Sequence, residues 1–123
     1  MSLIYVMLGG AFGSGARYLT GRATSSLFGP DFPYGTLAVN LIGGLLMGAL
    51  VGSLTRSSNA ETWRLLLGVG VLGGFTTFSS FSLDAVTMIE RGQIGIALGY
   101  VALSVVGSII ALFAGLSLAR TVA

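Results

Sequence analysis

Apolar residues dominate four long stretches of the chain. These stretches cover residues 3–23, 34–54, 65–89 and 94–118. Each is close to the ~20 residues that an α-helix needs to cross the hydrocarbon core of a bilayer. The first stretch is the weakest, because Arg17 and Arg22 fall in its second half. The pattern predicts an all-α membrane protein with four transmembrane helices in a single domain, residues 1–123.

Turn-forming and polar residues separate these stretches. Both prolines, Pro30 and Pro33, fall in the first connection, residues 55–62 form a polar second connection, and residues 90–92 form a short third one. Proline and glycine clusters of this kind interrupt helices and favour turns. We therefore expect a turn-rich loop, a polar loop and a tight hairpin between the four spans.

The third stretch contains the run Gly-Gly-Phe-Thr-Thr-Phe-Ser-Ser-Phe at residues 73–81. Glycine has low helix propensity, and threonine and serine hydroxyls compete for backbone hydrogen bonds. We therefore predict that this helix is broken in mid-membrane. Freed carbonyl groups at such a break are suitable ligands for a hard cation. A packing kink with an intact helix is the alternative interpretation.

The composition excludes most catalytic chemistry. The chain contains no cysteine and no histidine, which removes the usual thiolate and imidazole metal ligands and the commonest general base. Six arginines and four acidic residues are too few for a nucleic-acid surface. We expect a protein that is not an enzyme, binds no nucleic acid and has membrane lipid as its surroundings.

The arginines are balanced between the two sides of the expected four-span bundle. One side collects Arg56, Arg64 and Arg120, and the other collects Arg17, Arg22 and Arg91. An excess of cationic residues in cytoplasmic loops normally fixes the orientation of a membrane protein. Without such an excess we expect insertion in both orientations and an antiparallel, dual-topology homodimer. If Arg17 is packed inside the bundle, a weak bias toward cytoplasmic termini remains.

Small residues recur at four-residue spacing in three of the stretches. The sets are Gly9 with Gly13, Gly44 with Gly48 and Gly52, and Gly70 with Gly74. In lipid, helices associate through close packing, and small residues let their backbones approach. We predict that these glycines are helix contacts.

Several side chains in the spans are candidates for an anion pathway. Asn40 is an amide in an apolar stretch, and its NH₂ group is able either to donate to an anion or to join two helices. Phe78 and Phe81 are three residues apart, and their electropositive ring edges suit an anion, although ordinary core packing is the alternative. Thr77 lies beside Phe78 and adds a hydroxyl.

The last span and the first add further polar candidates. Tyr100, Ser104 and Ser108 repeat every four residues, so their hydroxyls lie along one stripe of a helix. Serines of membrane helices also bond to their own preceding turn, which is the alternative. Arg17 is expected either to attract anions to a vestibule or to bond the carbonyls of the broken helix.

Acidic residues are scarce in the spans. Asp84 lies in the second half of the third stretch, and the other three stretches contain no carboxylate. A proton exchanger driven by a membrane carboxylate is therefore poorly supported. Spans that offer hydrogen-bond donors but almost no carboxylate acceptors favour an anion as the transported ion.

Three collinear segments carry a resemblance to a known family. They are Gly-Gly-Ala-Phe-Gly-Ser-Gly-Ala-Arg-Tyr at residues 9–18, Gly-Thr-Leu-Ala-Val-Asn at 35–40, and the run at 73–81. With them the chain closely resembles the CrcB/Fluc family of fluoride channels. The resemblance implies a dual-topology dimer in a bacterial inner or plasma membrane, with two antiparallel pores that export fluoride passively.

The resemblance also implies roles for individual residues. It makes Asn40 a fluoride donor and Phe78 and Phe81 the paired pore phenylalanines. It places a structural sodium ion at the dimer interface on the backbone carbonyls of Gly73 and Thr76. The further matches are the polar track of Tyr100, Ser104 and Ser108, the first-helix arginine Arg17, and Ser80, where the family often has threonine.

Two other classes of protein fit parts of the pattern. Small dual-topology multidrug exporters also have four spans, but they need a carboxylate in the first span, which this chain lacks. A non-conducting assembly subunit would be favoured if the run at residues 73–81 were fully helical and dry.

Overall fold

The computed structural model describes residues 2–54 and 58–122, so Arg56 of the expected charge balance lies outside the described residues. Within those residues all regular structure is helical. The elements are α1 Ser2–Phe28, α2 Tyr34–Leu54, α3 Ala60–Trp63, η1 Arg64–Leu72, α4 Gly73–Phe75, α5 Ser79–Glu90 and α6 Ile94–Val122. The all-α fold predicted from the sequence is confirmed.

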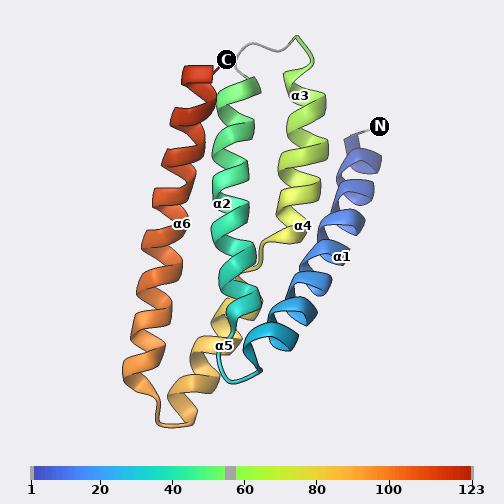
Figure 1. The fold of residues 1–123 in the computed structure, drawn as a ribbon. Coiled ribbons are helices and arrows are strands. Elements are labelled where there is room, and N and C mark those ends of the chain that lie inside the picture. The colour runs from blue at the N-terminus through green and yellow to red at the C-terminus, as the bar shows by residue number, and fades with distance from the viewer. Residues whose placement is uncertain (1, 55–57, 123) are drawn as a thin grey trace.

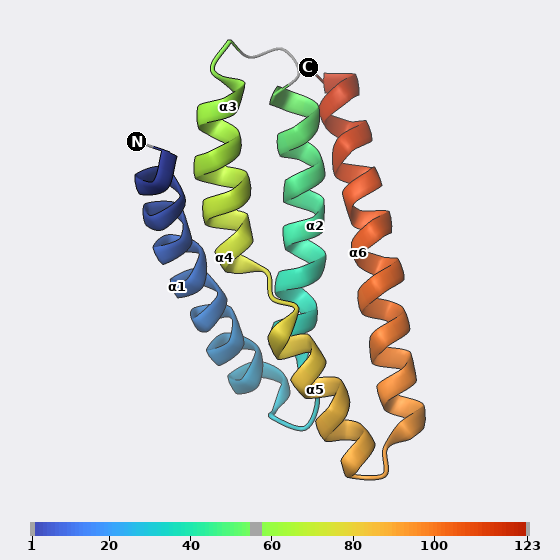
Figure 2. The ribbon, with the colours of Figure 1, turned by 180° about the vertical axis from the view of Figure 1, so that it is seen from behind.

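The helices form an elongated bundle (Figures 1 and 2). Helix α2 packs along α6, and α1 packs along η1 and α4. The two marked chain ends and α3 lie toward one end of the bundle (Figure 1). The turns after α1 and α5 lie at the other end, where Gly29 and Gly92 adopt φ values of +89° and +79°. Such left-handed backbone is where glycine is favoured over other residues.

Three helical segments of the described chain are long and apolar enough to cross a membrane. They are Tyr34–Leu54, Ala60–Glu90 and Ile94–Val122. Helix α1 has 27 residues, which is long enough, but it is less apolar and is not among the three. The fourth span remains a prediction.

The helix break is narrower than the run that predicts it. Helix α4 ends at Phe75, Thr76 is extended with φ −84° and ψ 159°, and α5 begins at Ser79. The first and last three residues of the run at 73–81 are helical. The Thr77 hydroxyl accepts a hydrogen bond of 3.2 Å from the Ser80 N–H in the first turn of α5.

The helix upstream of the break is a π-helix. Element η1, Arg64–Leu72, has nine residues and joins α3 to α4. Runs of π-helix are rare and occur often at functional sites. Nothing in the apolar pattern of residues 65–72 distinguishes this geometry from an α-helix.

The predicted glycine contacts are confirmed. A Cβ atom added to Gly13 would collide with the Val71 carbonyl oxygen and would lie 2.8 Å from the Phe75 nitrogen. On α2, a Cβ at Gly48 would collide with the Leu112 carbonyl oxygen of α6. Backbone therefore meets backbone at both interfaces, as expected for helices that associate in lipid.

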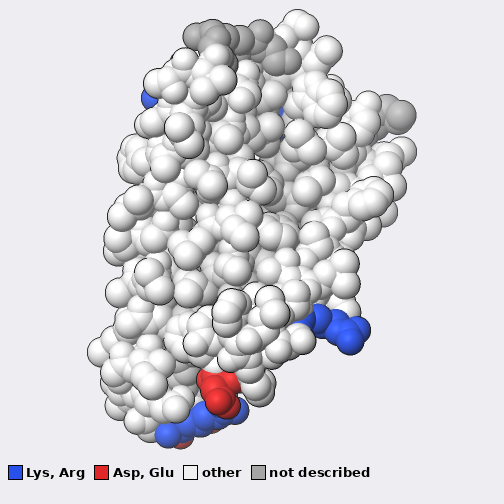
Figure 3. All heavy atoms as spheres, in the orientation of Figure 1, with Lys and Arg blue, Asp and Glu red and all other residues white. Residues whose placement is uncertain are grey.

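Many large apolar side chains are exposed on the molecular surface. On the face drawn in Figure 3, most charged atoms lie toward the end opposite the termini, and only small blue patches appear elsewhere on that face. Large side chains such as Phe12 and Phe113 are 76% and 64% exposed in the single chain. An exposed apolar surface of this extent suits lipid or a second copy of the chain.

A candidate anion pathway at the helix break

A cavity of about 530 Å³ lies beside the break, and we call it the break groove. It is lined from α2, α6 and the segment around Thr76. The predicted residues that line it are Asn40, Gly73, Thr76, Thr77, Phe78, Phe81, Ser104 and Ser108. Helices far apart in sequence thus bring most of the candidate pathway together.

Asn40 joins α2 to the break through both ends of its amide. The Thr77 N–H donates to Asn40 Oδ1 at 2.9 Å, and Asn40 Nδ2 donates to the Thr77 carbonyl at 3.1 Å. The helix-joining role considered from the sequence is therefore present. An amide NH₂ group has two hydrogens, so one remains for the groove that Asn40 lines.

Phe78 and Phe81 lie together but in different surroundings. Their ring centroids are 5.6 Å apart, with 48° between the ring planes. Phe78 is 76% exposed in the single chain, whereas Phe81 is 8% exposed and packs against the Tyr100 ring at 5.2 Å. Phe81 is thus both a groove residue and a core residue.

The hydroxyl stripe of α6 divides into two parts. Ser104 and Ser108 line the break groove, and Tyr100 does not. Ser104 is 5% exposed, and its Oγ has no hydrogen-bond partner among the described residues. The alternative bond of Ser104 to its preceding turn is therefore not formed, and this hydroxyl remains able to donate.

Tyr100 is buried and paired with a residue that the sequence analysis left without a role. The Tyr100 hydroxyl donates to Asp84 Oδ2 at 3.1 Å. Asp84 lies three residues after Phe81, so both face α6 from the same side of α5. That helical spacing was the available sequence signal for the Asp84–Tyr100 pair.

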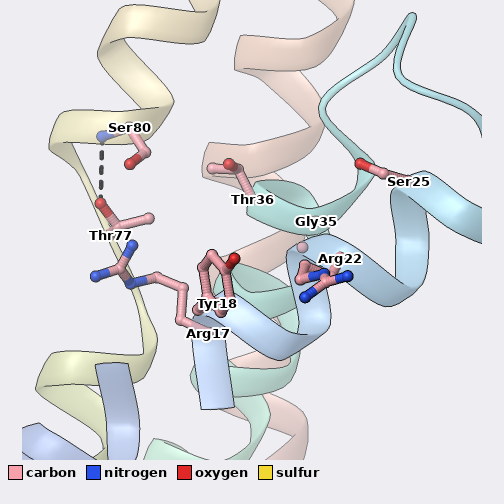
Figure 4. Close-up of a pocket in the computed structure, with 9 residues that line it drawn as sticks. Arg17, Tyr18, Arg22, Ser25, Gly35, Thr36, Thr77 and Ser80 are labelled. Atoms are coloured by element: carbon pink, nitrogen blue, oxygen red, sulfur yellow. Dashed lines mark hydrogen bonds between the residues drawn. The ribbon is translucent and has the colours of Figure 1, made fainter. Parts of the chain in front are cut away.

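Arg17 bonds the broken helix. Its Nε donates to the Gly74 carbonyl at 3.1 Å, one residue before the end of α4. Of the two roles expected for Arg17, this contact is the second. Arg17 also lines a second cavity of about 490 Å³, which we call the arginine pocket (Figure 4).

The break leaves backbone carbonyls free. The Thr77 N–H, which would reach the Gly73 carbonyl in a continuous helix, donates to Asn40 instead. Within the part of the chain that the structure describes, no hydrogen bond reaches the carbonyls of Gly73 or Thr76. The same part contains no group of three or more His, Cys, Asp or Glu side chains able to hold a metal ion. Free carbonyl oxygens are a ligand type that hard cations accept.

The fold and the groove together define a class of protein. Long apolar helices make the chain a multi-pass membrane protein, and the groove beside the break presents hydrogen-bond donors and aromatic rings. Hydrogen-bond donors and the electropositive edges of aromatic rings are groups that suit a small anion.

Comparisons with known proteins agree with this class. The model of the family described as CrcB-like protein, Camphor Resistance (CrcB), matches residues 4–116, and the chain belongs to this family. A protein of Caulobacter vibrioides is 55% identical over 122 residues, covering 98% of this chain and 96% of its own length. Proteins of Novosphingobium aromaticivorans and Agrobacterium fabrum are 51% and 54% identical over 121 residues, covering 97% and 98% of this chain and 96% and 97% of their own lengths. All three bear the name fluoride-specific ion channel FluC.

Proposed function

We propose that this chain forms a fluoride-selective ion channel that lets fluoride leave the cell passively. The observation that carries the proposal is the break groove, where the Asn40 amide, the Ser104 and Ser108 hydroxyls and two phenylalanine rings line one cavity. Among the residues that the structure describes, no Asp or Glu lines that groove. The relatives named as fluoride-specific channels support fluoride as the ion.

The groove would work by replacing the water around the ion. Fluoride is small and strongly hydrated, so hydrogen-bond donors have to take the place of its water molecules. Asn40 and Ser104 each have a donor that no described residue occupies, and the ring edges of Phe78 and Phe81 add weak positive potential. Several weak sites without one deep site allow fast passage. Such a channel is not an enzyme and needs no catalytic residue.

A second copy of the chain would complete the groove. Phe78, Val105 and Ile109 line it and are 76%, 46% and 54% exposed, so a partner that covers the groove would bury them. Together with the arginine balance predicted from the sequence, this exposure supports an antiparallel homodimer of four-span chains. A C-terminal reporter that reads out on one side of the membrane only would contradict the antiparallel arrangement.

A structural sodium ion would stabilise this dimer at the break. The free carbonyls of Gly73 and Thr76 would hold it, and the ion would fix the extended backbone between α4 and α5. Protein prepared throughout in sodium is expected to be dimeric. Protein prepared throughout in N-methylglucamine is expected to lose dimer and to unfold at lower temperature. Equal dimer fractions and equal unfolding temperatures in both preparations would exclude the ion.

Fluoride efflux from liposomes tests the function. Vesicles that contain the purified protein and are preloaded with fluoride should lose it rapidly once the membrane potential that opposes fluoride efflux is discharged. Vesicles preloaded with chloride should not lose chloride under the same conditions. Efflux that requires a proton gradient would instead indicate an exporter of the small multidrug type. Absence of efflux would favour a non-conducting assembly subunit.

A further inference from the structure

The arginine pocket contains a second cation that the helix break does not use. Its lining includes Arg17 and Arg22 of α1, Thr36 of α2, and Thr77 and Ser80 at the break. Figure 4 shows Arg17 extended toward Thr77, whereas the guanidinium of Arg22 lies apart from that segment. Arg17 is committed to the Gly74 carbonyl. Among residues 2–54 and 58–122, no ion pair and no side-chain hydrogen bond of Arg22 is formed.

The arginine pocket is positive and its neighbour is not. Within the described part of the chain, no carboxylate lines the arginine pocket, whereas two guanidinium groups do. An adjoining cavity of about 310 Å³ shares Gly21, Ser25, Gly35 and Thr36 with it, and is lined by Asp31, Asp84 and Arg91. An anion at this end of the molecule is therefore attracted to the arginine pocket and not to the adjoining cavity.

The arginine pocket also adjoins the proposed pathway. Thr77 lines both the arginine pocket and the break groove, and the adjoining acidic cavity lacks it. The Thr77 segment consequently borders both cavities.

We propose that Arg22 collects fluoride in the arginine pocket and raises its concentration at the entrance of the break groove, whereas Arg17 holds the break in place. This inference rests on the proposed channel function. Arg22 acts through its charge and not through a fixed contact, because its guanidinium is exposed and unpaired within the described residues. Attraction of this kind depends on ionic strength.

The size of the effect follows from simple electrostatics. At a separation on the order of 7 Å in water, one unit charge changes the local concentration of a monovalent ion about threefold. In about 0.01 M salt the screening length is ~30 Å, and in about 1 M salt it is ~3 Å. The contribution of Arg22 should therefore be present at low salt and almost absent at high salt.

The experiment measures fluoride efflux from liposomes that contain the wild-type chain, Arg22→Lys, Arg22→Gln or Arg22→Glu, with an impermeant organic salt setting the ionic strength. In about 0.01 M salt, Arg22→Gln should lower efflux about threefold and Arg22→Glu about tenfold, and Arg22→Lys should match the wild type. In about 1 M salt all four should agree within about 1.5-fold.

Two results would overturn the role of Arg22. One is an unchanged or raised efflux of Arg22→Gln at low salt. The other is a loss of equal size at low and high salt, or one that Arg22→Lys shares, because a structural defect is not screened. Absence of fluoride efflux from the wild-type chain would instead overturn the channel function itself, so the two failures are distinguishable.

Discussion

Phe78→Ile is expected to reduce fluoride efflux about tenfold or more while the protein still folds. Isoleucine keeps an apolar side chain but has no electropositive ring edge. A tenfold change corresponds to about 1.4 kcal/mol, which is the order of a quadrupole interaction with a desolvated ion. Because Phe78 is 76% exposed in the single chain, its replacement removes little packing within that chain.

Phe12→Ile is the matched control for this change. Phe12 is also 76% exposed, but it lies on α1 and does not line the break groove. Its replacement should leave efflux unchanged in the same liposome assay. Equal efflux from wild type and Phe78→Ile would remove the aromatic pathway from the proposed mechanism. Phe81→Ile is less informative, because Phe81 is 8% exposed and its loss also disturbs the packing against Tyr100.

Asn40→Ala is expected to abolish efflux and to lower the unfolding free energy by about 1–3 kcal/mol. The change removes both hydrogen bonds to Thr77, so the N–H and carbonyl of that residue lose their partners. It also removes the amide donor from the break groove. Efflux and thermal unfolding of the purified protein measure the two effects separately.

Ser53→Ala is the control for Asn40→Ala on the same helix. The Ser53 hydroxyl donates to the Ala49 carbonyl of its own turn at 2.8 Å and lies outside the break groove. Its loss should change neither efflux nor unfolding temperature measurably. An Asn40→Ala protein that retains wild-type efflux would show that the second amide hydrogen has no part in conduction.

Much of the fold could be predicted because bilayer thickness imposes it. Apolar stretches long enough to span the membrane predicted the long helices, and the run of Gly, Thr and Ser predicted the break. Asn40, Phe78 and Ser104 could be selected because polar or aromatic groups beside such a break need partners or a path. Their convergence on one cavity is the finding that the structure adds.

Other features depend on contacts between distant segments. The π-helix η1 has the same apolar pattern as an α-helix, so periodicity could not reveal it. The bond from Arg17 to Gly74 joins residues 57 positions apart, so the sequence alone could not show which of the two roles expected for Arg17 has a contact in the fold. Asp84 acquires a partner only when α5 folds against α6 and Tyr100 comes within hydrogen-bond distance.

The separation between Arg17 and Gly74 also has a consequence for synthesis. Helix α1 leaves the ribosome before η1 and α4, against which its glycines pack. During that interval α2 is already available to pack against it, but the Gly74 carbonyl that accepts a hydrogen bond from Arg17 is not. The contacts of this helix with η1 and α4, including the bond from Arg17 to the break, therefore form only after the second half of the chain has been made.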